Sequence, residues 1–216
     1  MKSPDLILFA KQPNLGQVKT RLQPDYDPDQ IVEIAKFLIR ATVELAVSGW
    51  PSSVYLYGVP DADHAFFHEL AEEFRVHLAS QTSGDLGKRM LQALREGISR
   101  GSAAAVMGCD VPQCRWEVVE RAHEHLASGK NVIGPTEDGG YYLIGLQKAP
   151  SRLFDNIEWG SASVLQTTLV QARKFGMEFE QLPKLRDVDT GDALWLVAQE
   201  YEPLRKHLYH VLRGSA

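Results

Sequence analysis

The sequence predicts an α/β fold, a three-layer α/β/α sandwich around a mostly parallel sheet. Short apolar runs alternate with segments of helical periodicity along the 216 residues, a pattern typical of parallel sheets covered by helices. A tight Glu-Asp-Gly-Gly turn at residues 137–140 separates two of the apolar runs. Only antiparallel neighbours close through so short a loop, so we expect one antiparallel strand in the sheet.

The elements follow from these patterns in chain order. Strands are expected where short apolar runs are bounded by polar residues or glycine. Asp27 is the expected N-cap of the first helix, with Pro28 at the first helical position and Gln30 in the capping-box position. The predicted strands are residues 6–10, 54–57, 76–78, 103–107, 132–134, 141–146 and a strand near Phe179; the predicted helices cover residues 31–46, 65–74, 90–98 and 161–175, with one opened by Pro112 and two at the C-terminal end.

Composition bounds the function. Hydrophobic residues make up 44% of the chain and no repeat or linker divides it, so we expect one domain over residues 1–216. A net charge of −5 disfavours nucleic acid as a partner, and no segment has the length of a membrane helix. The N-terminal apolar run is too short for a signal peptide. Cys109 and Cys114 match no zinc or redox motif, so reduced thiols in a cytoplasmic protein are expected. The oligomeric state stays open.

A basic loop follows the first predicted strand. Lys11, Lys19 and Arg21 lie in it with Gly16, which would let the backbone approach a ligand. The loop is not a P-loop, because Val18 rather than glycine precedes the lysine, and the chain has no G-x-G-x-x-G fingerprint. Ligands of open α/β sheets lie beyond the carboxyl ends of the strands. We therefore interpret the loop as a phosphate site, with a solvated basic loop as the alternative.

Two acidic positions could bind a divalent metal. Asp110 follows the strand at residues 103–107, and the alternative role is capping of the next helix. Asp187 and Asp189 lie in a second cluster, where Asp189 or Thr190 could instead cap the following helix. An EF-hand does not fit the second cluster, because its glycine stands at the fifth position and its twelfth residue is not Glu.

Other motifs are weaker. The Asp138-Gly139 pair is a strong hairpin signal, and from the residues alone the turn interpretation is favoured over a pocket wall. The histidines form no zinc-protease pattern, and no serine lies in a G-x-S-x-G elbow.

Six motifs follow one another over nearly the whole chain. They are residues 9–22 with Lys11, Pro13, Gly16 and Val18-Lys19-Thr20-Arg21-Leu22; residues 84–90 with Gly84-Asp85-Leu86-Gly87 and Arg89; Gly108, Asp110 and Pro112; Gly134-Pro135 with Asp138-Gly139-Gly140-Tyr141; Ile157 and Trp159; and Asp187-Val188-Asp189-Thr190. In this order they resemble the bacterial glycosyltransferase-like family of the nucleotide-diphospho-sugar transferases. The chain is also similar, more distantly, to 2-phospholactate guanylyltransferase and to the molybdopterin guanylyl- and cytidylyltransferases. It departs from the family pattern at Gly160, which stands between Trp159 and Ser161.

The resemblance implies a GT-A-like fold with a nucleotide-binding half at residues 1–110 and an acceptor-binding half at residues 111–216. It implies Mg²⁺ or Mn²⁺ as the cofactor. The implied phosphate and nucleotide residues are Lys11, Gly16, Lys19, Arg21, Gly84, Asp85 and Arg89; the metal ligands are Asp110, Asp187 and Asp189; the acceptor residues are Asp138, Gly139 and Trp159; and the catalytic residues are Lys19, Asp110 and Asp138.

Three functions stay open at this point. The first is a metal-dependent glycosyltransferase that moves a sugar from a nucleotide-diphospho-sugar to a small acceptor, which the resemblance favours. The second is a nucleotidyltransferase that uses a nucleoside triphosphate and releases pyrophosphate. The third is a non-catalytic nucleotide-binding module, because a fold does not by itself fix an activity.

Overall fold

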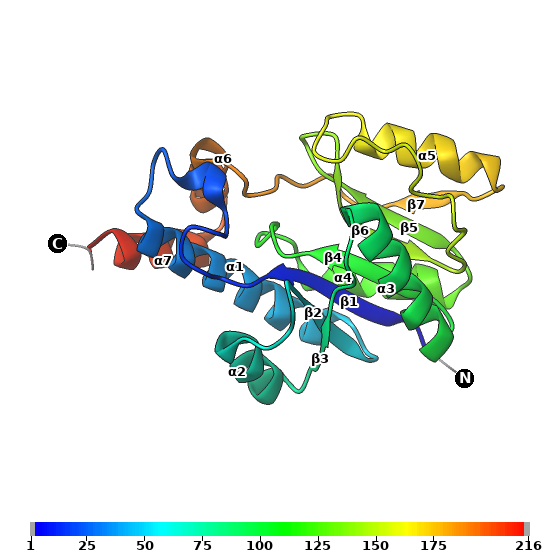
Figure 1. Ribbon diagram of the computed structural model, residues 1–216, viewed down its shortest axis with the longest axis horizontal. Coiled ribbons are helices and arrows are strands. Elements are labelled where there is room, and N and C mark those ends of the chain that lie inside the picture. The colour runs from blue at the N-terminus through cyan, green and yellow to red at the C-terminus, as the bar shows by residue number, and fades with distance from the viewer. Residues whose placement is uncertain (1–2, 214–216) are drawn as a thin grey trace.

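One sheet with helices on both faces forms the centre of the molecule (Figure 1). The computed structural model describes residues 3–213. The sheet has seven strands in the order β3-β2-β1-β4-β6-β5-β7, and β6 runs antiparallel to both of its neighbours. The α/β sandwich and its antiparallel strand are thus confirmed. The strands are β1 (Asp5–Lys11), β2 (Val54–Val59), β3 (His77–Ser80), β4 (Ala104–Gly108), β5 (Asn131–Pro135), β6 (Tyr141–Leu146) and β7 (Phe179–Gln181).

Helices bury the two faces of the sheet in separate cores. One face packs against α1 (Pro28–Gly49), α2 (Ala65–Phe74) and α4 (Trp116–Ala127). The other packs against α3 (Leu86–Arg100) and α5 (Val164–Lys174). The first helix begins as expected, because the Gln30 Oε1 accepts a hydrogen bond from the Asp27 backbone N–H at 3.0 Å.

A third core lies beyond the sheet. The N-terminal half of α1 extends past the strands and packs against α6 (Gly191–Glu200) and α7 (Glu202–Arg213), seen at the left of Figure 1. Leu22, the last residue of the short 3₁₀ helix η1 (Thr20–Leu22), is buried in the same cluster, and so is Val18, two residues before η1. The basic loop after β1 is therefore anchored to helices from the other end of the chain.

One element boundary was predicted wrongly. Pro112 does not open a helix, and α4 begins at Trp116. Residues 111–114 instead form a turn, in which the Cys114 backbone N–H donates to the Val111 carbonyl at 3.0 Å. The Gln113 amide donates to the Arg186 carbonyl at 2.6 Å, which ties this turn to the segment between β7 and α6.

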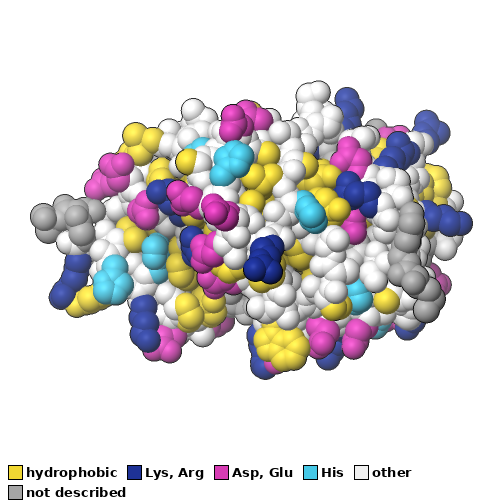
Figure 2. Space-filling model, turned by 90° about the horizontal axis from the view of Figure 1, so that it is seen from below, with side chains coloured by type: hydrophobic (Ala, Val, Ile, Leu, Met, Phe, Trp, Pro, Cys, Tyr) yellow, Lys and Arg dark blue, Asp and Glu magenta, His cyan; other side chains and the backbone are white. Residues whose placement is uncertain are grey.

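The helices and the charged side chains on the surface are relevant to membrane and nucleic-acid binding. Within residues 3–213, no helix combines the length and apolar character needed to cross a membrane. On the face in Figure 2, acidic and basic side chains are interspersed and no continuous basic area is visible. That face lacks the extended basic patch typical of nucleic-acid binding. Cys109 and Cys114 are both buried free thiols.

Candidate active site

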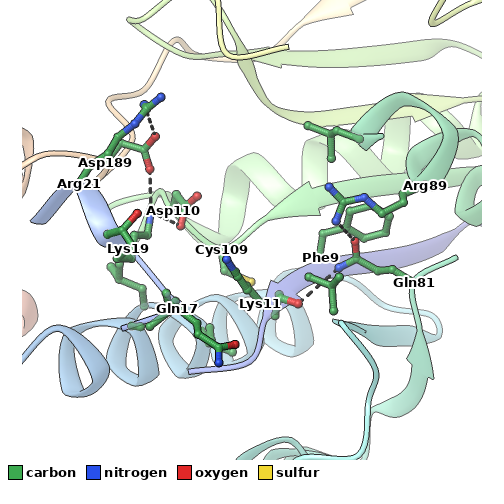
Figure 3. A pocket seen from close by; sticks show the side chains of 18 residues that line it. Phe9, Lys11, Gln17, Lys19, Arg21, Gln81, Arg89, Cys109, Asp110 and Asp189 are labelled. Atoms are coloured by element: carbon green, nitrogen blue, oxygen red, sulfur yellow. Dashed lines mark hydrogen bonds and ion pairs between the residues drawn. The ribbon is translucent and has the colours of Figure 1, made fainter. Parts of the chain in front are cut away.

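A cationic pocket lies where the sheet order reverses. β1 has β2 on one side and β4 on the other, so the loops that follow β1 and β4 meet at the topological switch point. A cavity of about 370 Å³ opens there between these loops and α3 (Figure 3). We call it the cationic pocket; its lining includes Lys11, Lys19, Arg21, Arg89, Gln17, Gln81, Phe9, Leu86, Asp110 and Asp189.

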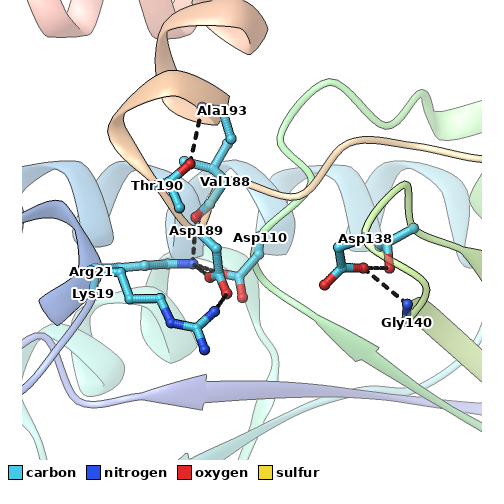
Figure 4. Close-up of polar contacts among 10 residues, drawn as sticks. Lys19, Arg21, Asp110, Asp138, Gly140, Val188, Asp189, Thr190 and Ala193 are labelled. Carbon is cyan, nitrogen blue, oxygen red and sulfur yellow. Dashed lines mark hydrogen bonds and ion pairs between the residues drawn. The ribbon is translucent and has the colours of Figure 1, made fainter. Parts of the chain in front are cut away.

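Lys19 holds three separate segments together at one end of this pocket (Figure 4). Its Nζ lies 2.6 Å from Asp110 Oδ1 and 2.9 Å from Asp189 Oδ1, and it donates to the Val188 carbonyl at 2.6 Å. An ammonium has three N–H donors, so all of them are used within the protein. Burial alone would lower the pKa of Lys19, but attraction to the two aspartates raises it above its ordinary value. The ammonium therefore stays charged.

The backbone at Lys19 is unusual as well. Its φ of 44° is left-handed, which is uncommon for a residue with a side chain. Such conformations persist where the surroundings fix them, and they gather at functional sites. Here the three contacts of the ammonium and the burial of Val18 and Leu22 fix the loop on both sides.

Neither Asp110 nor Asp189 caps a helix. α4 begins six residues after Asp110, and α6 is capped by Thr190, whose Oγ1 accepts from the Ala193 N–H at 3.3 Å. Asp189 Oδ2 pairs instead with Arg21 Nη1 at 3.2 Å. Burial raises the pKa of Asp189, but Lys19 and Arg21 lower it more, so its net pKa lies below the ordinary value. Neither carboxylate is therefore used as a helix cap, and both contact Lys19 instead.

A second cavity, of about 300 Å³, adjoins the first and shares Asp110 with it. We call it the acidic pocket, because Asp110, Asp138 and Asp187 line it and no Lys, Arg or His within residues 3–213 does. Burial, with repulsion first from Asp138, raises the pKa of Asp187 to about 6. The rest of the wall is largely apolar or aromatic: Phe9, Met90, Val106, Tyr141, Tyr142, Trp159 and Val164.

Asp138 serves both as a turn residue and as part of the pocket wall. Its Oδ1 accepts from the Thr136 hydroxyl at 2.5 Å and from the Gly140 N–H at 2.9 Å, which fixes the β5–β6 turn. Its Oδ2 has no protein hydrogen bond within the described chain. Gly139 lines neither pocket; its φ is +93° and an added Cβ would lie 2.1 Å from the Ala162 carbonyl oxygen. Close backbone packing therefore requires glycine here, and its role as an acceptor residue stays a prediction.

Arg89 lies at the opposite end of the cationic pocket from Lys19 (Figure 3). Its Nη1 donates to Gln81 Oε1 at 3.0 Å, and the Gln81 amide donates to the Tyr57 carbonyl at 2.8 Å. No carboxylate within residues 3–213 pairs with this guanidinium. Gln81 was not among the predicted site residues. It directly follows β3, and the rule that ligands lie beyond the carboxyl ends of the strands could have identified it.

Three predicted nucleotide residues do not line the cationic pocket. Gly16 and Gly84 adopt positive φ values of 69° and 116°, so they shape the loops. Asp85 caps α3, because its Oδ1 accepts from the Lys88 N–H at 2.8 Å. By contrast, Lys11, Lys19, Arg21 and Arg89 all line it. Trp159 and Gly160 line the acidic pocket, where Gly160 adopts a φ of +85°.

The predicted metal ligands are only partly brought together. Within the described residues, no three His, Cys, Asp or Glu side chains are grouped so as to hold a metal ion. Asp189 is engaged by Lys19 and Arg21, whereas Asp187 lines the acidic pocket beside Asp110. Carboxylate oxygens are the donors that Mg²⁺ and Mn²⁺ prefer, and Mg²⁺ commonly uses one or two of them with substrate phosphates and water. The donor chemistry therefore fits a metal that is completed by a ligand.

Comparison with known proteins identifies the family. Residues 42–161 match the family described as uncharacterized protein conserved in bacteria (DUF2064). A solved structure from Desulfovibrio desulfuricans G20, provisionally named a nucleotide-diphospho-sugar transferase, is 30% identical with a TM-score of 0.83. The match covers 99% of this chain and 95% of that one. The chain belongs to the DUF2064 family. No curated protein matches its sequence.

More distant structures share the fold. A nucleotidyl transferase from Methanothermobacter thermautotrophicus is 12% identical, with a TM-score of 0.58 over 98% of this chain and 99% of that one. Glucosyl-3-phosphoglycerate synthase from Mycobacterium tuberculosis, solved with Mn²⁺, UDP and glucosyl-3-phosphoglycerate, is 9% identical, with a TM-score of 0.53 over 99% and 79%. At these identities the likeness establishes the GT-A-like fold, on which both sugar and nucleotidyl transfer are found.

Proposed function

We propose that this protein is a metal-dependent glycosyltransferase that moves a sugar from a nucleotide-diphospho-sugar to a small acceptor. The observation that carries the proposal is the pair of pockets of opposite charge that meet at Asp110, at the switch point of the sheet. A donor with a diphosphate has one cationic pocket to occupy, and an acceptor has a separate, adjoining one. The relative from Desulfovibrio desulfuricans G20 is provisionally named a nucleotide-diphospho-sugar transferase, which supports a transferase of this class.

The donor would lie along the cationic pocket. Lys11, Arg21 and Arg89 provide positive charge along a cavity of about 370 Å³, the size of a nucleotide-binding cleft. Lys19 has no spare donor, so its role would be to position Asp110 and Asp189. Direct contact between Lys19 and a phosphate would require one of its three protein contacts to open.

Asp110 and Asp187 would hold Mg²⁺ or Mn²⁺ together with the donor phosphates. Bound there, the ion would supply positive charge to the leaving diphosphate. Asp189, the third predicted ligand, remains a ligand only by prediction, because Lys19 and Arg21 engage both of its oxygens.

The reaction would take place where the pockets join. The acceptor hydroxyl oxygen forms a bond to the anomeric carbon of the sugar. The bond from that carbon to the diphosphate oxygen breaks, and the nucleoside diphosphate leaves with the electron pair. The hydroxyl proton passes to Asp138, whose Oδ2 is free of protein hydrogen bonds within the described chain. Arg21 and Arg89 stabilise the charge that develops on the leaving group.

The test is a ligand-stabilisation scan followed by product analysis. The melting temperature is measured with Mg²⁺ or Mn²⁺ against nucleotide sugars and nucleoside triphosphates, since native-state ligands raise it in a concentration-dependent way. We expect a metal-dependent shift with at least one nucleotide sugar, release of the nucleoside diphosphate, and loss of both in Asp110→Asn. Asp155→Asn, which removes an exposed carboxylate outside both pockets, is the matched control.

Two results would replace the proposal. A shift with a triphosphate alone, with pyrophosphate released, would establish nucleotidyl transfer. A shift that Asp110→Asn leaves intact, without turnover of any donor, would establish a non-catalytic nucleotide-binding module.

A further inference from the structure

We infer that the acceptor of this enzyme carries no negative charge: it is an uncharged hydroxyl compound without a phosphate or carboxylate group. This inference rests on the proposed function and names the chemical class of its second substrate. It concerns the acidic pocket, whereas the donor is assigned to the cationic pocket.

The wall of the acidic pocket has no positively charged side chain, among the described residues, with which an anion could pair. Three carboxylates line it and no Lys, Arg or His among residues 3–213 does. Phosphate and carboxylate groups are normally bound by Arg, Lys or clustered backbone N–H groups. An anion here would lose its hydration against Asp138 and Asp187 without a counter-charge.

Two cations on segments next to the pocket do not serve it. Lys19 uses all three donors on Asp110, Asp189 and the Val188 carbonyl, so an acceptor phosphate could bind it only by breaking a contact of the fold. Arg186, directly before Asp187 in the chain, pairs through Nε with Glu137 Oε2 at 2.8 Å and does not line the pocket. Arg89, next to Met90 in the chain, lines the cationic pocket and is assigned to the donor.

A bound metal would not reverse this conclusion. Asp110 and Asp187 would share the ion with the donor diphosphate, and the two carboxylates and two phosphates together carry more negative charge than one divalent ion neutralises. The Asp138 carboxylate would remain. The aromatic and aliphatic side chains of Phe9, Tyr141 and Trp159 suit a ligand with an uncharged body. The Asp138 Oδ2 would accept a hydrogen bond from its hydroxyl.

The inference separates this chain from one of its fold relatives. The synthase from Mycobacterium tuberculosis was solved with glucosyl-3-phosphoglycerate, which carries a phosphate and a carboxylate. Within residues 3–213, the acidic pocket of the present chain has no Lys, Arg or His side chain to neutralise such groups.

Matched acceptor pairs give the first test. With the donor found in the stabilisation scan, nucleoside diphosphate release is compared for glycerol against glycerol 3-phosphate and for glucose against glucose 6-phosphate. We expect kcat/KM for the uncharged member to be higher by about tenfold or more. Equal or better use of the phosphorylated members would overturn the inference.

A second measurement needs no knowledge of the true acceptor. In a Trp116→Phe/Trp195→Phe background, Trp159 is the accessible tryptophan, because Trp50 is only 3% exposed. Caesium should quench its fluorescence at least about threefold better than iodide, since the local potential is negative. Equal quenching, or stronger quenching by iodide, would overturn the inference even if no compound of the panel is used.

A charge variant with a matched control completes the design. Ser161→Arg places a guanidinium in the pocket wall. It should reduce both the kcat/KM advantage of uncharged acceptors and the excess of caesium over iodide quenching. Ser163→Arg places the guanidinium two residues away, outside the wall, and should change neither. The two proposals fail differently. Absence of any donor shift contradicts the transferase, whereas a donor shift with preferred phosphorylated acceptors contradicts only the acceptor class.

Discussion

The cationic and the acidic pocket share a wall at Asp110, yet the chain builds them in different ways. The basic side chains of the first come chiefly from one loop, residues 11–21, with Arg89 added from α3. The carboxylates of the second come from three separate places: Asp110 after β4, Asp138 in the β5–β6 turn and Asp187 in the segment before α6. The charge of the cationic pocket therefore depends mainly on the sequence of one loop. The charge of the acidic pocket depends on which segments the sheet topology brings together.

Asp187 and Asp189 show what this difference does to identical side chains. They are two residues apart, but Asp189 faces Lys19 and Arg21 and has a lowered pKa. Asp187 is half-buried near other carboxylates, and its pKa is raised to about 6. The segment from Asp187 to Asp189 thus divides the pockets, with a compensated carboxylate on one side and an uncompensated one on the other.

The largest effect is expected where the pockets meet. Asp110→Asn should lower kcat/KM for the donor by about 10³-fold, because the charge at the junction serves both substrates. Steady-state kinetics measure this. Asp155→Asn, which removes an exposed carboxylate outside both pockets, should stay within about threefold in activity and within about 0.5 kcal/mol in stability. Activity of Asp110→Asn close to the wild type would remove the shared residue from the mechanism.

The next largest effect concerns the contact that keeps the pockets distinct. Lys19→Met leaves Asp110 and Asp189 without their shared cation and should destabilise the fold by about 2 kcal/mol, measured by urea unfolding. Adding Asp189→Asn should restore part of that loss. Lys36→Met, which breaks an exposed pair with Glu33, should cost less than about 0.5 kcal/mol. Equal losses in both lysine variants would mean that the buried contact has no special weight.

A third test separates the pockets kinetically. Arg89→Gln should raise the donor KM about tenfold and leave the acceptor KM unchanged, because the guanidinium has no carboxylate partner within the described chain and is free for the donor. Trp159→Leu should do the reverse. Arg95→Gln, on the same helix but outside both pockets, is the control. If each variant changed both constants alike, the two cavities would act as a single site.

The sequence predicted much of this arrangement for a simple reason. Polar residues at the carboxyl ends of parallel strands converge, so Lys11 and Asp110 could be assigned to one edge of the sheet in advance, whereas a pocket role for Asp138 was implied only by the family resemblance. The fold class followed from the same alternation of strands and helices. Gly139 shows the limit of motif reasoning, because its conformation and its packing on Ala162 already require glycine, so its presence in a motif is no separate evidence for ligand contact.

The partner of Lys19 could not be predicted. Asp189 lies 170 residues further along the chain, and the contact depends on how α6 and α7 pack against α1. The same packing decides that Asp187 and Asp189 line different pockets. Local patterns carry no information on such long-range pairing, so Asp187 and Asp189 were predicted together as metal ligands, and only the structure separates their environments.

The smallest expected effect tests the uncompensated carboxylate itself. The pKa of Asp187 is about 6 in the folded protein, against about 3.9 in an unfolded chain. Protonation therefore stabilises the fold, and this contribution is complete below pH ~4 and lost as the pH rises through 6. Asp187→Asn has no such loss. In EDTA, its Tm should match the wild type near pH 4 and exceed it by roughly 2–4 °C at pH 8, after allowance for solvent screening.

Thermal unfolding across this pH range measures the difference, and Asp155→Asn, an exposed aspartate outside both pockets, is the control that should show no such crossover. A Tm advantage of Asp187→Asn that is equal at pH 4 and pH 8 would show that charge repulsion is not its cause. An advantage that appears only at pH 8 and disappears when a divalent metal and a donor are added would show that the acidic pocket is kept charged for its ligands. The fold would then carry a local loss of stability that binding removes.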